Sequence, residues 1–231
     1  MTQAACKQET TERRQHHDAI CLALGAATKG SGWRAIASYS AAIRDINGLF
    51  VQAKWRPIGP DYDADVAFQC LVKPMAADPL LWQILDIEGN ETKSLSFRMK
   101  GVFTCSPVLV NSTENDGRDL AKLGKTFRRF LEECHRRVIA THDSFADLVA
   151  SERVVHPEHK SLFETHALAL ILENRLKEAR LEIQRGMDLS LSVMRSFFSK
   201  EVDVHGKWPQ RMLSFAEMAN LWIEKNRTEG G

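Results

Sequence analysis

Residues 108–123 have the sequence VLVNSTENDGRDLAKL, and the pair Asp116-Gly117 within them marks a change of hydrophobic period. Before this pair, from Trp33 to Val110, apolar residues come in short runs that are typical of strands. After it, from Leu120 to Trp222, they recur every three or four residues, as in helices. A strand-rich half followed by a helix-rich half predicts an α+β fold and argues against a doubly wound nucleotide-binding sheet.

The first half is predicted to contain an N-terminal helix, about five mostly antiparallel strands and one short inserted helix. Its clearest signal is Asn47-Gly48, because a type I′ hairpin turn requires positive φ at both central residues. After a flexible tail at residues 1–10, the first helix is expected at residues 11–28. The expected strands are residues 33–45, 49–58, 65–73, 95–99 and 102–110. Asp78-Pro79 predicts the start of the short helix, at residues 79–85.

The second half is predicted to form a C-terminal bundle of three to four helices. One apolar stripe indicates a long helix at its start. The stripe consists of Leu120, Leu123, Phe127, Phe130, Cys134 and Val138. Another helix is expected from Pro157 to Met187, apolar on nearly all sides over residues 162–172, and a last one ends near Ile223. Residues 189–204 fit either a helix or a strand. We expect the two halves, residues 11–115 and 116–231, to form one globular unit.

The composition is that of an ordinary globular protein. The chain has 31 Lys and Arg residues against 30 Asp and Glu residues, so its formal charge of +1 excludes a general polyanion binder. The amino terminus lacks the apolar core of a signal peptide, and the apolar stretch at residues 19–27 is too short to cross a bilayer. We therefore expect a cytoplasmic protein that does not enter a membrane. The 5 cysteines include no C-x-x-C pair and are expected to be reduced.

Gly124-Lys125-Thr126 is similar to the end of a phosphate-binding loop. That loop needs another glycine five residues upstream and must join a strand to a helix. Here Asp119 occupies the glycine position, and the segment lies inside the predicted long helix. This context argues against an ATPase, and no other cofactor motif is present, so no cofactor is expected.

His156, His159 and His166, together with Glu158, form the densest group of candidate metal ligands. Their spacing differs from the i, i+4 pairs that bind zinc on a helix, and Pro157 stands where the predicted helix begins. Capping and surface roles for His156 and His159, and a hydrogen-bonded core position for His166, are the simpler interpretation. A metal-dependent hydrolase that uses His156, His159 and Glu158 stays as an alternative.

A metal-dependent nuclease pairs an acidic residue with a later Glu-x-Lys on a strand, where they hold a cation and orient water. Asp61, Asp86, Glu91 and Lys93 could supply these groups. However, Glu91-Thr92-Lys93 is predicted to lie in a turn. Solvated turn residues are therefore the simpler interpretation.

The predicted helix from Arg118 to Arg137 has a basic side. The side carries Lys122, Lys125, Arg129 and Arg136, with Glu132 and Glu133 interleaved. It suits a solvated, salt-bridged face, a surface for an acidic protein, or a face that binds RNA or DNA phosphates. The last is disfavoured because no aromatic residues interleave with these charges as stacking platforms.

Four motifs follow one another between residues 11 and 110. They are Gly32-Trp33 after the opening helix, NGLFVQ at residues 47–52, VAFQ at residues 66–69 and PLLW at residues 79–82. In this order they resemble a group of small bacterial α+β proteins of uncharacterised function, some of which are similar to toxin-immunity proteins. The resemblance implies no catalytic residues.

The leading hypothesis is a non-catalytic binding protein, an immunity protein that occludes a cognate bacterial toxin acting in the cytosol, such as a nuclease effector. Aromatic and arginine side chains dominate the desolvated centres of interfaces, so Trp55, Trp82, Arg129 and Arg136 are the candidate contact residues. A metal-dependent hydrolase or nuclease is the first alternative, and a nucleic-acid-binding accessory protein is the second. The sequence leaves the oligomeric state open.

Overall fold

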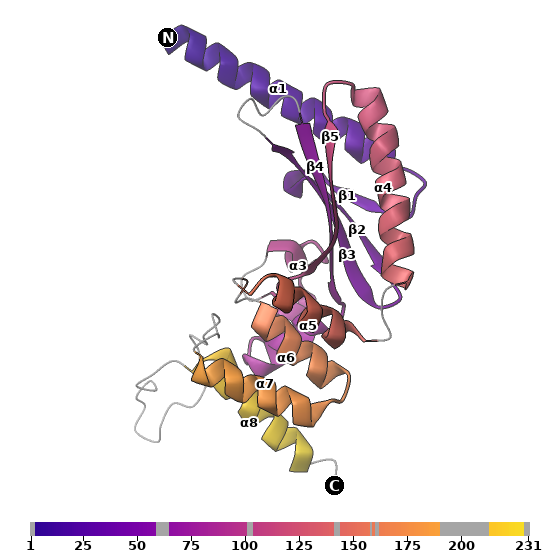
Figure 1. Cartoon of the computed structure of the whole chain (residues 1–231). Helices are drawn as coiled ribbons and strands as arrows, with labels where there is room; N and C mark the ends of the chain where they lie inside the picture. Colours follow the sequence, from indigo (N-terminus) through magenta and orange to yellow (C-terminus); the bar gives the residue numbers. More distant parts are fainter. Residues whose placement is uncertain are drawn as a thin grey trace. The chain divides into compact units, whose positions relative to one another are not determined.

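The chain divides into two compact units (Figure 1). The computed structural model describes residues 3–58, 65–100, 104–140, 144–157, 159, 162–189 and 213–228. Met1–Val72 and Leu109–Thr141 form one unit, which we call the sheet unit. Lys73–Val108 and His142–Gly231 form the other, the helical unit. The division therefore does not follow the change of period at Asp116-Gly117.

The predicted α+β class and its order of elements are confirmed. An N-terminal helix precedes a five-stranded antiparallel sheet with short helical insertions, and further helices follow. The strands are β1 (Arg34–Ile36), β2 (Ala41–Ile46), β3 (Leu49–Ile58), β4 (Asp65–Pro74) and β5 (Val108–Asp116). They lie side by side in chain order, so each strand pairs with the strand next to it in the sequence.

The turn between β2 and β3 has the predicted conformation. Asn47 has a φ of 52° and Gly48 a φ of 78°, and Ile46 pairs with Leu49 across the turn. The first predicted arm, in contrast, is two strands. A 3₁₀ helix, η1 (Ala37–Tyr39), and Ser40 with a φ of 46° separate β1 from β2.

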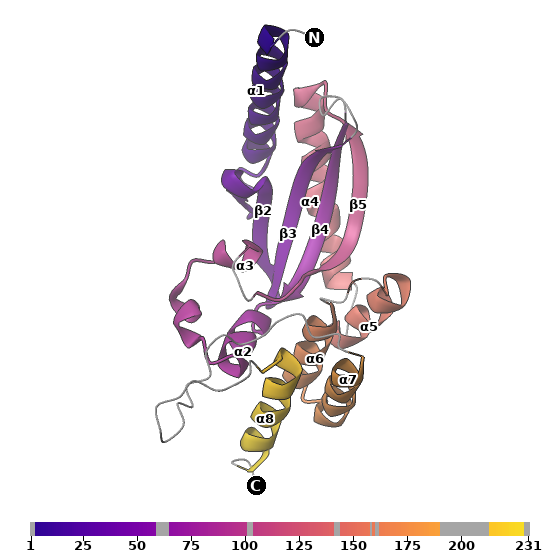
Figure 2. The same ribbon diagram turned by 90° about the vertical axis from the view of Figure 1, so that its left-hand side faces the viewer.

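Helix α4 (Leu120–Ala140) covers one face of the sheet (Figure 2). Its predicted apolar stripe is confirmed as the buried side of the helix. The Phe127 ring lies 5.3 Å from the Trp55 ring of β3 and 4.9 Å from the Phe68 ring of β4, with edge-on geometry in both pairs. These contacts form the core of the sheet unit and explain why α4 belongs with the strands.

Helix α1 (Gln3–Ala27) lies against α4 by its second half. Ile20 and Leu24 are buried there. The first half of the helix extends beyond the sheet and α4 (Figures 1 and 2). Residues 3–10, predicted to be a flexible tail, are thus part of a helix.

The helical unit is built around α6 (Leu162–Leu172). This helix is buried on nearly all sides, as its composition predicts, and it contacts α2 (Ala77–Ile84), α5 (Phe145–Val155) and α7 (Leu176–Asp188). Helix α8 (Phe215–Thr228) contacts α7 and α2. Within the part of the chain that the structure describes, no helix combines the length and the apolar character that crossing a bilayer requires.

Two predicted segments differ from the structure in the helical unit. Residues 95–99, expected as a strand, run into the single helical turn α3 (Phe97–Lys100), after the 3₁₀ helix η2 (Glu88–Thr92). The helix expected to continue to Met187 is interrupted, because Asn174 adopts a φ of 57° between α6 and α7.

Helix α5 is absent from the sequence prediction, although Ser144 and Asp147 form a recognisable start signal for it. The segment at residues 190–204, most of the stretch that fits either a helix or a strand, lies outside the described residues, as does Val102 at the start of the fifth predicted strand.

Candidate functional site

The two tryptophans predicted to contact a partner lie in the core. Trp55 and Trp82 expose only 2% and 1% of their surface. Trp55 donates its Nε1–H to the Cys21 Sγ over 3.4 Å, and the Trp82 ring lies 6.2 Å from the Phe97 ring. Neither side chain is accessible on the surface, so the prediction that they contact a partner directly has to be corrected: both are core residues. Their large apolar area stabilises the fold instead.

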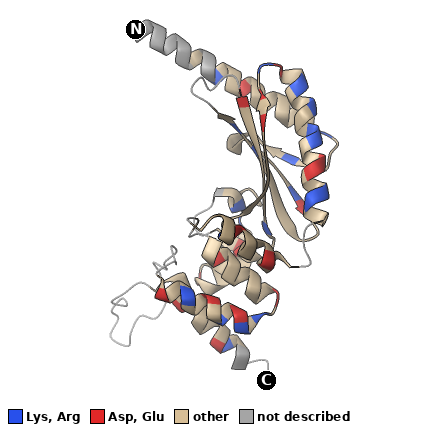
Figure 3. Ribbon diagram, viewed as in Figure 1, with Lys and Arg blue, Asp and Glu red and all other residues tan. Residues whose placement is uncertain are grey.

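The two predicted arginines, Arg129 and Arg136, are exposed on α4, where Figure 3 shows a row of cations interrupted by acidic residues. Arg136 donates to both carboxylate oxygens of Glu133, over 2.8 and 2.6 Å, and Arg137 donates to the same carboxylate. These hydrogen bonds lower the pKa of Glu133 to about 2. Part of the basic side is therefore salt-bridged. Arg129 makes no such contact with any described residue.

A groove of about 700 Å³ lies between α1 and α4. Its floor consists of small or apolar residues, and its rim is mostly charged. The floor residues are Ala23, Ala27, Leu120, Ala121 and Gly124, and the rim residues are Lys125, Arg128, Arg129 and Glu132. The Gly124-Lys125-Thr126 segment lies within α4, as predicted, and not in a phosphate loop. Gly124 and Lys125 also line this groove.

Arg128 is held in place by the end of α1. Its Nη1 donates to the carbonyls of Lys29, over 2.8 Å, and Ala27, over 3.4 Å. The last carbonyls of a helix have no partner within the helix, so Arg128 caps α1. Lys125 and Arg129 remain as the exposed cations of the rim.

His166 belongs to an ion cluster that links three helices. Arg153 of α5 donates to the His166 Nδ1 over 3.0 Å and forms an ion pair with Glu182 of α7. Burial would raise the pKa of Glu182, but the contacts with His166 and Arg153 outweigh it and lower that pKa. His166 is therefore hydrogen-bonded between helices, as expected.

The other two candidate metal ligands lie beyond the end of α5. The His156 and His159 rings stack with their centroids 5.1 Å apart, and His156 lies 3.6 Å from Glu152. Glu158 lies outside the described residues. Among those that are described, no group of three or more His, Cys, Asp or Glu side chains has a geometry that could hold a metal ion.

The residues considered for a nuclease do not share a strand. Glu91 lies in η2, Lys93 caps the end of that 3₁₀ helix, and Asp86 follows α2. Asp61 lies outside the described part of the chain. The described residues therefore lack the strand placement that a nuclease requires of its Glu-x-Lys.

A buried ion pair that no sequence motif indicates lies in the helical unit. Lys73 and Asp78 are both fully buried, with Lys73 Nζ 2.9 Å from Asp78 Oδ1. Lys73 also donates to the carbonyls of Arg98 and Cys105. Burial, reinforced by the charge of Asp78, raises the pKa of the Cys105 thiol. The cluster is closed to solvent, which suits a structural role rather than catalysis.

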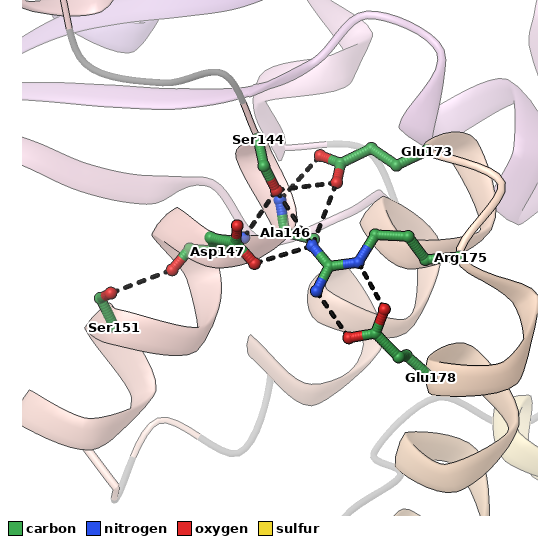
Figure 4. Close-up of polar contacts among 7 residues, drawn as sticks. All are labelled: Ser144, Ala146, Asp147, Ser151, Glu173, Arg175 and Glu178. Atoms are coloured by element: carbon green, nitrogen blue, oxygen red, sulfur yellow. Dashed lines mark hydrogen bonds and ion pairs between the residues drawn. The ribbon is translucent and has the colours of Figure 1, made fainter.

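Arg175 connects the start of α5 to the start of α7 (Figure 4). It donates to Asp147 over 2.7 Å and to both oxygens of Glu178 over 2.8 and 2.6 Å. Glu173 accepts hydrogen bonds from the Ser144 hydroxyl and the Ala146 amide. Every carboxylate in this cluster is engaged by a donor, so the cluster fixes helix ends.

No protein-family model, curated protein or solved structure matches the chain. The α1–α4 groove combines small and apolar lining residues with exposed residues of both charges. Its floor residues come from positions about 100 apart in the sequence, so no local motif could have revealed it. It is the candidate binding site.

Proposed function

We propose that this protein is a non-catalytic binding protein that occludes an acidic surface of a protein partner with its α1–α4 groove. The observation that carries the proposal is the apolar floor beside the exposed cations Lys125 and Arg129. An apolar centre with a charged rim is the usual anatomy of a protein interface. The cations would steer an acidic partner toward the groove and fix its orientation.

The partner that best fits the sequence is a bacterial toxin acting in the cytoplasm, such as a nuclease effector. In this proposal the protein is its immunity protein and resides in the same compartment. Support comes from the motif order at residues 11–110 and from the groove itself. Many nucleases bind cations through carboxylates, so a basic rim is complementary to the acidic centre of such an enzyme.

A pull-down from the native cell tests the proposal, with three forms of the chain as bait after nuclease treatment. They are the wild type, the double variant Lys125→Glu/Arg129→Glu, and Lys177→Glu as a matched charge reversal on α7 in the helical unit. We expect one protein to be retained by the wild type and by Lys177→Glu but lost from the double variant. Expression of that protein alone should stop growth, and co-expression of the wild-type chain should restore growth.

Three outcomes would contradict the proposal. The double variant could retain the partner as well as the wild type does, which would exclude the groove. The retained protein could lack toxicity, which would exclude the immunity role. Recovery of ribosomes or nucleic acid alone, without a specific protein, would exclude a protein partner.

A nucleic-acid-binding accessory role is the second candidate, because the exposed cations Lys122, Lys125 and Arg129 lie on α4 and the exposed Arg118 lies just before it. Fluorescence anisotropy with labelled RNA and DNA measures it. Binding through phosphates would weaken with salt, with a slope of log K against log salt of about −0.7 to −0.9 per phosphate contacted. Lys125→Glu/Arg129→Glu would reduce that slope. Binding without salt dependence would argue against this role.

A further inference from the structure

A second hollow, of about 280 Å³, adjoins the α1–α4 groove in the sheet unit. Arg128 and Glu132 line both hollows and separate them. The second one is bordered by the turn after α1, by β2 and by α4. Its apolar wall includes Leu131 and Trp33, which are largely buried.

Two guanidinium groups in this hollow are anchored to the same turn. Arg44 Nη1 donates to the Ser31 carbonyl over 3.1 Å, and Arg128 Nη1 donates to the Lys29 carbonyl over 2.8 Å. A guanidinium has five N–H donors, so each arginine keeps donors beyond those that hold it in place. The backbone thus brings two positive charges to one small polar space.

Gly32 makes room for one of these groups. A Cβ built at Gly32 would lie 3.3 Å from the Arg44 Cζ, closer than most real contacts of a Cβ atom. Gly32 also has a φ of 77°, a conformation that side chains disfavour. Because Gly32 has no side chain, the guanidinium of Arg44 can pack against the backbone of this turn.

His135 supplies an independent observation. Its Nδ1 is buried and has no hydrogen-bond partner among the residues that the structure describes, and its side chain lines the hollow. A buried polar atom without a partner costs free energy unless something pairs with it. With its proton on Nδ1, the imidazole is a third donor beside the two arginines.

We propose that this hollow binds a small oxyanion of the phosphate class. Two arginines and an imidazole match the several acceptor oxygens of a phosphate, which guanidinium groups bind in bidentate geometry. The volume of about 280 Å³ is sufficient for a free phosphate. Glu132 Oε1 lies 4.0 Å from Arg128 Nε and offsets part of the Arg128 charge, but Glu132 is 73% exposed, so water weakens this ion pair.

This site is separate from the role proposed for the groove and does not depend on it. Isothermal titration calorimetry of the whole chain with inorganic phosphate, at ionic strength held constant with potassium chloride, tests it. We expect one phosphate per chain. Arg44→Gln and His135→Ala should each raise the Kd about tenfold or more, because each removes a charge-assisted or buried donor. Circular dichroism confirms that both variants are folded.

Arg137→Gln is the matched control, because Arg137 is an exposed arginine of α4, the helix that carries Arg128 and His135, but it lines neither hollow. It should leave the Kd for phosphate unchanged. Sodium acetate, titrated in the same way, should bind at least tenfold more weakly, since it offers two oxygens and a single charge. Absence of phosphate binding at millimolar concentration, an equal loss in Arg137→Gln, or equal binding of acetate would each overturn the proposal. Should Arg44→Gln fail to fold, His135→Ala decides the matter alone.

Discussion

Two glycines inside helices differ in the space around them. A neighbouring ring fills the space beside Gly186, whereas Gly124 has room for a methyl group. A Cβ at Gly186 of α7 would overlap the ring of Phe163, which is fully buried in α6. A Cβ at Gly124 of α4 would lie 3.7 Å from the Ala23 carbonyl of α1, which is an ordinary contact. The first glycine is required by the packing of α6 on α7, whereas the second is not required by its neighbours.

We therefore expect opposite effects of the same substitution. Gly186→Ala should lower the free energy of unfolding by about 1–3 kcal/mol or more, the usual cost of overpacking a core. Gly124→Ala should leave it unchanged or raise it by about 0.5–1 kcal/mol, because alanine favours the helix over glycine. Urea unfolding followed by circular dichroism measures both. A large loss of stability in Gly124→Ala would show that the α1–α4 contact is tighter than the structure indicates.

At the scale of elements, the start of α5 depends on side chains from the connection between α6 and α7. Ser144 is the N-cap of α5, and its hydroxyl oxygen accepts a hydrogen bond from the Asp147 amide. Arg175 donates a hydrogen bond to the Asp147 carboxylate. Hydrogen bonds from Arg175 lower the pKa of Asp147 and of Glu178 below their ordinary values of 3.8 and 4.5. The two carboxylates thus bind a proton less readily in the folded chain than in the unfolded one.

The sign of the pH dependence follows from these shifts. A carboxylate with a lowered pKa contributes stability above its unfolded pKa, and that contribution is lost as pH falls through its folded pKa. We expect the stability of the wild type to fall as pH drops below about 4.5 and to fall less steeply in Arg175→Met. Urea unfolding at a series of pH values measures the slope.

Arg129→Met is the control for this experiment. It removes an exposed guanidinium of α4 that makes no salt bridge with a described carboxylate, so it should leave the acid slope unchanged. Asp147 and Glu178 are exposed, so solvent reduces both effects. An unchanged acid slope in Arg175→Met would show that the Arg175 cluster contributes nothing to stability.

The elements that the sequence predicted well have local causes. The Asn47-Gly48 turn depends on the conformational preference of two residues, and the stripe of α4 on a regular period. The residues at 95–99 were predicted wrongly because distant groups organise their surroundings: Lys73 binds the Arg98 carbonyl, and the Arg98 guanidinium lies over the Trp82 ring. Asn174 and Ser144 are signals that could have located the break after α6 and the start of α5.

At the scale of the whole molecule, the chain has two compact units, so a substitution in the core of one unit should destabilise that unit first. The buried pair Lys73–Asp78 lies in the helical unit, and Asp78 also accepts the amide of Cys105 over 2.8 Å. Removing one member of such a pair leaves an uncompensated charge in the core. The cost should therefore fall first on the helical unit.

We expect Asp78→Ala to destabilise the helical unit by about 3–5 kcal/mol, as for other broken buried ion pairs. Hydrogen exchange measured by mass spectrometry should show lost protection in α2 and α6, while β3 and α4 keep theirs. The double variant Lys73→Met/Asp78→Asn removes both charges and keeps an acceptor for Cys105, so it should recover part of the loss. Equal loss of protection in both units would show that they unfold together.

The sequence by itself determined the class of fold, the type I′ turn, the long amphipathic helix and the enclosed position of residues 162–172. These follow from backbone preferences and from periods that extend over a few residues. Only the tertiary structure decided that α4 joins the sheet, that Trp55 and Trp82 are core residues, and that Arg44 and Arg128 meet at one turn. The physical reason is that such contacts join residues far apart in the chain. A local pattern shows that one face of an element is apolar, but not which other element packs against that face.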